Sequence, residues 1–107
     1  MKISIDASIF VGSDTAYGRV SGYLAVAAIP TQGALISFQF PLAGTLPLPQ
    51  NFDGQLRVAS VIFRPSLEEE APVMVMLEDL VFDSVKDAKE AAEYLTHGFH
   101  LAVDEYQ

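Results

Sequence analysis

Cysteine is absent from this chain of 107 residues, and basic side chains are scarce. Without thiols there is no disulfide scaffold, thiolate zinc site, iron–sulfur cluster or cysteine nucleophile. Six Lys and Arg stand against fourteen Asp and Glu, which gives a net charge of −8 and an isoelectric point near 4.4. So acidic a chain does not suit nucleic acid as a ligand, because neutralisation of phosphates by basic side chains supplies most of that affinity.

Long apolar runs and targeting signals are also lacking. The longest continuous apolar stretch, residues 24–30, is far shorter than the roughly 20 residues that a membrane-spanning helix needs. Asp6 interrupts the apolar region that a signal peptide requires. We therefore expect no membrane partner and a cytoplasmic location.

The composition that is present favours one folded domain, residues 1–107. Half of the residues are apolar and 19% are charged, whereas disorder needs low hydrophobicity together with high charge. This apolar content is generous for the core of so small a chain, so part of it is expected at a subunit contact of a homo-oligomer.

Alternation of apolar and polar residues predicts five strands in the region 1–82. The predicted strands cover residues 2–11, 19–29, 34–40, 55–64 and 73–82. A turn at residues 30–33 predicts that the second and third strands form a hairpin. The pattern of the fifth slips at Glu78 and Asp79, which indicates a bulge or sharp bend there.

Prolines set residues 41–55 apart. Pro41, Pro47 and Pro49 exclude a helix or a central strand, while the leucines between them are too apolar for a solvated linker. An ordered loop over one end of the sheet fits this composition. Such a loop can also act as a functional lid, although covering the core is the simpler explanation.

A helix is predicted over residues 84–106. Ser84 and Asp87 resemble a capping box, and apolar residues from Val85 onward recur at intervals of three and four. The alternative is a break at Gly98, followed by a second short helix. The resulting fold is α+β: a five-stranded, strongly curved or partly closed antiparallel sheet with one long C-terminal helix packed on it.

Catalytic and cofactor motifs are missing. The glycines form no nucleotide-phosphate loop, and no serine has the spacing of a nucleophile elbow. No cofactor is expected. A small enzyme without a recognisable motif is one alternative, and the side chains to inspect first for it are Tyr17, Arg19, Tyr23, Arg57 and Arg64.

One side of the predicted helix carries possible metal ligands. Carboxylates and imidazoles at this spacing suit a divalent metal. The side chains are Glu93, His97, His100 and Asp104. A solvated helix face explains them more simply, because the chain has no cysteine and no further histidine, so no metal site is expected.

The negative charge is concentrated in the C-terminal part. Residues 1–67 hold four basic and three acidic side chains, whereas residues 68–107 hold eleven acidic and two basic ones. Such a field steers basic partners, although it also serves solubility. Tyr94 and Leu101 would lie exposed together on a continuous helix and would add an apolar contact. The predicted partner-binding residues are Glu68, Glu69, Glu70, Glu78, Asp79, Asp83, Tyr94 and Leu101.

The leading hypothesis is therefore a non-catalytic protein-interaction module that presents an acidic surface to a basic protein, as an inhibitor or an immunity-type protein would. The alternative from another class is a small carrier of apolar ligands with a pocket between the sheet and the helix. The side chains expected to line that pocket are Phe38, Phe40, Phe63, Met74 and Met76. Packing of these side chains in an ordinary core is the simpler explanation.

Overall fold

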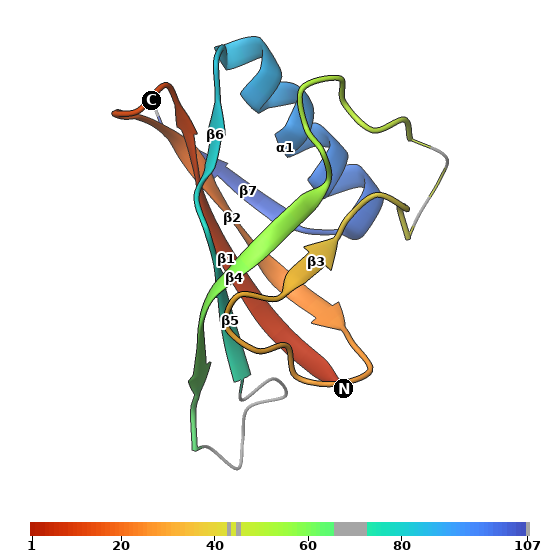
Figure 1. Ribbon diagram of the computed structural model, residues 1–107. Coiled ribbons are helices and arrows are strands. Elements are labelled where there is room, and N and C mark those ends of the chain that lie inside the picture. Colours follow the sequence, from red (N-terminus) through yellow and green to blue (C-terminus); the bar gives the residue numbers. More distant parts are fainter. Residues whose placement is uncertain (43, 45, 66–72, 107) are drawn as a thin grey trace.

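The two longest strands, β1 (Lys2–Val11) and β2 (Thr15–Ala25), form an antiparallel hairpin at the centre of the sheet. The protein is described by a computed structural model that covers residues 1–42, 44, 46–65 and 73–106 (Figure 1). The predicted alternation in residues 2–11 is confirmed, because Ile3, Ile5 and Ile9 are almost completely buried. The connection between them is shorter than the gap between the predicted strands 2–11 and 19–29, since pairing already resumes at Thr15.

Five shorter strands complete a mixed sheet within the described residues. They are β3 (Leu35–Ser37), β4 (Gln55–Phe63), β5 (Val73–Leu77), β6 (Leu80–Phe82) and β7 (Ala102–Glu105). The strand order is β3-β4-β5-β1-β2-β7, and β6 also pairs with β1, further along the strand than β5. Strands β5 and β6 run parallel to β1, whereas the other neighbouring strands are antiparallel.

This sheet corrects the predicted one. It has seven strands among the described residues instead of five, it is mixed, and it is not strongly curled. The predicted hairpin of the second and third strands is wrong, because β3 pairs with β4 and not with β2. The free edge of β2 is taken by β7. Parallel pairing of β5 with β1 is allowed because a long connection separates them in the chain.

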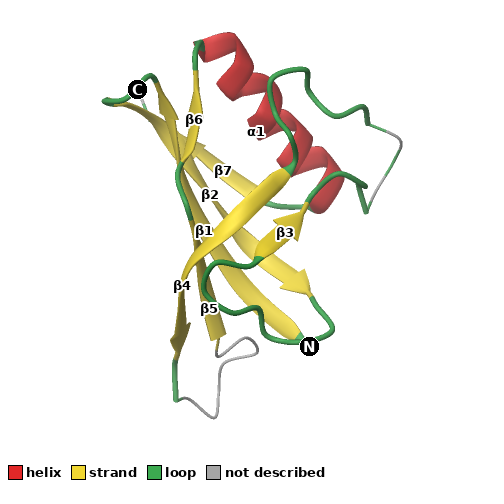
Figure 2. Ribbon diagram, in the orientation of Figure 1, coloured by secondary structure: helices red, strands yellow, loops and turns green. Residues whose placement is uncertain are grey.

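Within the described residues, one helix, α1 (Val85–Phe99), packs on one face of the sheet (Figure 2). The predicted cap is confirmed, since the Ser84 hydroxyl accepts a hydrogen bond from the Asp87 N–H at 3.1 Å. The predicted end at residue 106 is wrong. His100 adopts a left-handed backbone conformation, which commonly ends a helix. The N–H groups of His100 and Leu101 both turn back to the Leu95 carbonyl. The second short helix of the alternative is wrong too, because β7 follows.

The core lies between α1 and the sheet, and residues from the proline-rich stretch help to close it. Phe38, Phe52, Tyr94 and Phe99 meet edge to face, with ring centroids 4.9–6.0 Å apart. Leu42, at the start of this stretch, is held to the helix because its N–H donates to the Gly98 carbonyl at 2.9 Å. In the part of the chain that the structure describes, no helix is long and apolar enough to span a membrane.

Candidate functional site

A groove opens where β4 and β6 separate. Near the end of the pairing between β4 and β5, the Glu78 N–H donates to the Arg57 carbonyl at 2.8 Å. Beyond this bond β4 pairs with β3, whereas β6 follows β1, so the two strands diverge (Figure 1). The space between them is an open cavity of about 910 Å³ that is bounded by both strands and by residues 48–53.

Two consecutive acids explain why the chain bends here. β5 and β6 bury apolar side chains against the core, whereas Glu78 and Asp79 between them are exposed. In a regular strand, neighbouring side chains point to opposite faces, so one of these carboxylates would enter the core without a partner, at a high cost. The strand therefore breaks and resumes at Leu80, which confirms the predicted irregularity.

Apolar side chains and acids line the groove together. The apolar lining residues are Leu35, Leu48, Pro49, Phe52, Leu56, Leu80, Val81 and Phe82. The acidic lining residues are Asp53, Glu78 and Asp79, and Asp83 directly follows β6. Among the described lining residues only Arg57 is basic, and its guanidinium already donates to the Gly33 carbonyl at 2.6 Å. The groove therefore combines an apolar lining with an excess of negative charge.

A further carboxylate stands next to the groove at the start of α1. The side-chain amide of Asn51, a lining residue, donates to the Asp87 carboxylate at 3.0 Å. Asp53 in turn accepts a hydrogen bond from the Gln55 N–H at 2.9 Å, which places its carboxylate at the first residue of β4. These contacts hold two of the acids in place without neutralising them.

The predicted acidic residues divide into two groups. Glu78, Asp79 and Asp83 are exposed and lie at or directly beside the groove. The other group lies outside the described residues and consists of Glu68, Glu69 and Glu70. Asp53 and Asp87 were missed as members of this surface because they come from separate parts of the chain. The position of an acid within a loop or a helix does not indicate which strand it will face.

Tyr94 and Leu101 are not exposed, and this expectation is wrong. Both are 3% exposed. The Tyr94 hydroxyl donates to the carbonyl of Phe38, and Leu101 lies against Gly22 of β2. Tyr94 faces the core because Phe38 and Phe52 pack against that side of α1. Leu101 turns inward because the helix has already ended at Phe99.

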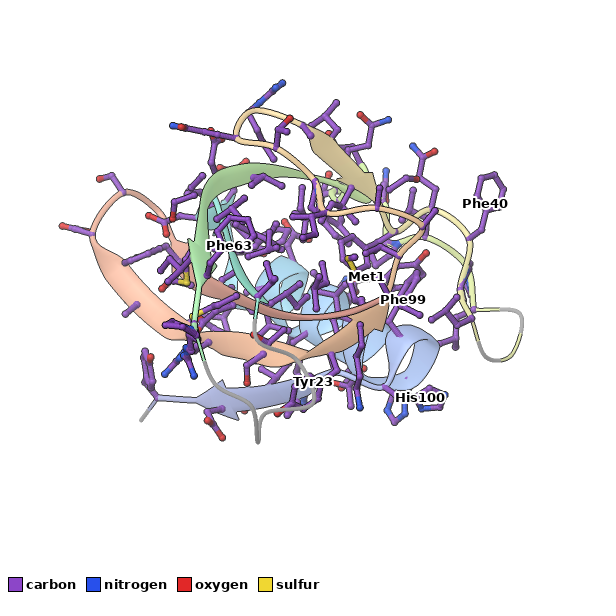
Figure 3. All side chains as sticks on the ribbon, turned by 90° about the horizontal axis from the view of Figure 1, so that it is seen from below. Met1, Tyr23, Phe40, Phe63, Phe99 and His100 are labelled. Atoms are coloured by element: carbon purple, nitrogen blue, oxygen red, sulfur yellow. The ribbon has the colours of Figure 1, made fainter. Side chains whose placement is uncertain are left out.

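The five side chains expected to line an apolar pocket do not come together in one cavity of the described residues. Phe38 is in the core, whereas Phe40 and Phe63 are 82% and 65% exposed. Figure 3 shows Phe40 pointing away from the body of the protein. Met74 and Met76 alternate with the buried residues of β5, so they lie on the sheet face opposite α1.

The predicted metal-binding face of the helix is interrupted by the end of α1. Glu93 and His97 lie on the helix, His100 is its left-handed cap, and Asp104 belongs to β7. Among the described residues no three His, Asp or Glu side chains come close enough together to hold a metal ion. Glu93 and His97 instead line a second cavity of about 410 Å³, beneath residues 46–50.

Four of the five side chains singled out for an enzyme make structural contacts away from the groove. Arg19 pairs with Asp6, and the Tyr17 hydroxyl donates to Glu105 at 2.8 Å. The ammonium of Lys2 lies 4.8 Å from the centre of the Tyr23 ring. A guanidinium nitrogen of Arg64 lies 3.6 Å from the Met74 sulfur. The fifth, Arg57, lines the groove.

Electrostatic effects are clearest at two of these side chains. The hydrogen bond and negative charge of Asp6 raise the pKa of Arg19. Partial burial, the hydrogen bond to Glu105 and the charges of Glu105 and Glu93 raise the pKa of Tyr17 to about 12. Both shifts stabilise the ordinary charge state of the side chain at neutral pH, so neither prepares a general base.

Comparisons of the chain with protein families, with curated proteins and with solved structures give no significant match.

Proposed function

We propose that this protein is a non-catalytic interaction module that docks a basic protein on the acidic groove between β4 and β6. The observation that carries the proposal is the position of Asp53, Glu78 and Asp79 on an open cavity with apolar lining residues. Apolar contacts in the centre of an interface supply affinity, and charges at its rim select the partner and accelerate its approach. An inhibitor or immunity-type protein that neutralises a basic protein would have such a surface.

Three exposed acids at the groove provide the test. A groove variant carries Glu78→Gln, Asp79→Asn and Asp83→Asn, which remove charge with little change in shape. A matched control carries Glu90→Gln, Glu93→Gln and Asp104→Asn, which lie on α1 and β7. Both variants lose three negative charges, so a difference between them reports the place of the charge and not its amount.

The protein and both variants are immobilised and exposed to an extract of the source organism. Proteins that are captured are identified and purified, and their affinities are measured at low and high salt. We expect a captured basic protein whose affinity falls about tenfold or more in the groove variant and much less in the control, with a steep loss at high salt. Equal binding by both variants, or no basic protein captured at low salt, would contradict the proposed function.

A further inference from the structure

Strand β6 presents to the groove a backbone edge that no described strand pairs with. Its pairing with β1 is parallel, and the Phe82 carbonyl accepts a hydrogen bond from the Gly12 N–H at 2.8 Å. Phe82, and Leu80 two residues before it, therefore direct their backbone groups toward β1. Because successive residues of a strand face opposite edges, the N–H and carbonyl of Val81 face the groove, where the Val81 side chain is 58% exposed.

The facing wall presents a similar edge. The Val58 N–H donates to the Ala34 carbonyl at 2.9 Å, and the Gly54 carbonyl accepts from the Phe38 N–H. Residues 54, 56 and 58 thus turn toward β3, and Gln55 and Arg57 turn toward the groove. The Arg57 carbonyl already accepts from Glu78, and the Gln55 N–H donates to Asp53. The Arg57 N–H and the Gln55 carbonyl still face the groove.

We propose that the basic partner binds through an extended segment that adds to β6 as a new strand inside the groove. This inference rests on the proposed function and specifies how the partner is held. An added strand satisfies the unpaired backbone groups of an edge, and alternate side chains give specificity. Apolar side chains of the segment would meet the exposed apolar lining residues Leu35 and Leu48. Lys or Arg between them would meet Glu78 and Asp79.

Charge argues against a second copy of this chain as the occupant. The terminal strands of the sheet are β3 and β7. β7 contains Asp104 and Glu105, and β3 contains no charged residue. Insertion of β7 would bring like charges together, and β3 would leave the groove acids without partners, so a basic segment fits better.

The probe is a short end-capped peptide of alternating lysine and valine. Two further versions carry N-methyl groups on alternate backbone amides, one on the lysines and the other on the valines, so that donors are removed from one edge at a time without a change of charge. Binding is measured by titration calorimetry at low salt, and the amide of Val81 is followed by NMR hydrogen exchange. On the protein side, Val81→Pro removes the N–H that faces the groove, while Val81→Ala retains it; circular dichroism checks the fold of both.

We expect the unmodified peptide to bind, to slow exchange at the Val81 amide, and to bind about tenfold more weakly when the donors of one particular edge are methylated. Val81→Pro weakens binding more than Val81→Ala does. If both methylated peptides bind as well as the unmodified one, or if the peptide does not bind at millimolar concentration, strand addition is wrong. Protection of Val81 in a dimer of the protein without peptide also overturns it. The capture experiment with the groove variant is independent of these outcomes, so the docking of a basic protein can survive the failure of strand addition.

Discussion

Arg19 holds the carboxylate of Asp6 with two hydrogen bonds across the β1–β2 hairpin, on the sheet face opposite α1. The Arg19 Nε donates to Oδ1 of Asp6 at 2.8 Å. Asp6 is 5% exposed, and among the described residues it is the one charged residue that is buried. The Arg19 side chain remains half exposed. A buried carboxylate in this position depends on its partner, because little water reaches it.

The first prediction tests how far the buried carboxylate of Asp6 depends on Arg19. Arg19→Val leaves Asp6 buried without its counter-charge, so the free energy of unfolding should fall. Adding Asp6→Val removes the buried charge, and the double variant should recover part of the loss. Urea unfolding of the two single variants and the double variant measures this coupling. If the double variant is no more stable than Arg19→Val, the pair does not carry the proposed coupling.

Tyr94 offers a second test inside the core. Its hydroxyl donates to the Phe38 carbonyl, and the phenol is 3% exposed. Tyr94→Phe retains the ring contacts with Phe52 and Phe99 and removes only the donor, so the carbonyl loses a buried partner. We expect a loss of about 1–2 kcal/mol in the free energy of unfolding. An unchanged denaturation midpoint would show that another donor replaces the hydroxyl.

The end of α1 predicts a stabilising substitution. His100 has φ 57° and ψ 32°, a conformation that glycine adopts without the penalty of a Cβ atom. His100→Gly should raise the free energy of unfolding by about 0.5–1 kcal/mol. The matched control is His97→Gly in the last turn of the same helix, which should lower it by about 0.3–0.5 kcal/mol. Thermal unfolding of both variants compares the same substitution of histidine by glycine at positions three residues apart. Equal shifts of the two melting temperatures would contradict this account.

Gly18 lies where β7 pairs with β2, opposite Glu105. A Cβ atom there would collide with the backbone carbonyl of Asp104, and backbone yields less easily than the end of a side chain. Gly18→Ala should lower the free energy of unfolding by about 2 kcal/mol. The substitution should also accelerate hydrogen exchange more in β7 than in α1, since the collision separates β7 from β2. Uniform loss of protection throughout the protein would indicate a different cause.

Local sequence patterns were sufficient to predict those segments whose conformation depends mainly on their own residues. The alternation in residues 2–11 predicted β1, and Ser84 with Asp87 predicted the start of α1. The end of α1 was missed because its left-handed residue is His100 and not glycine, while Gly98 lies inside the helix. The apolar period also continues past Phe99 at Ala102 and Tyr106, so the spacing predicts more helix although Ala102 begins a strand that pairs with β2. A burial pattern alone does not distinguish these two environments.

The candidate groove was only half predictable. The slip at Glu78 and Asp79 indicated a break in the fifth strand, and their charge indicated a surface. Nothing in the local sequence shows that β4 leaves β5 at this point to pair with β3. The partners of a strand depend on connections elsewhere in the chain, so the residues from Asp53 to Arg57 could not be assigned to the site in advance.

Tyr17 predicts the dependence of stability on high pH. Its pKa is raised from 10.0 to about 12 in the folded protein, by partial burial first and then by the hydrogen bond and charge of Glu105 and the charge of Glu93. A raised pKa means that the fold favours the neutral phenol. The contribution of Tyr17 to the free energy of unfolding is therefore complete below pH 10.0 and is lost as pH rises from 10.0 toward 12.

Over this range the stability of the wild type should fall more steeply than that of Tyr17→Phe. Urea unfolding across the range measures the difference, and the phenolate absorbance of the two proteins shows whether the missing titration lies near 12. Parallel stability curves, or a missing titration near pH 10.0, would show that the hydroxyl of Tyr17 is free in solution.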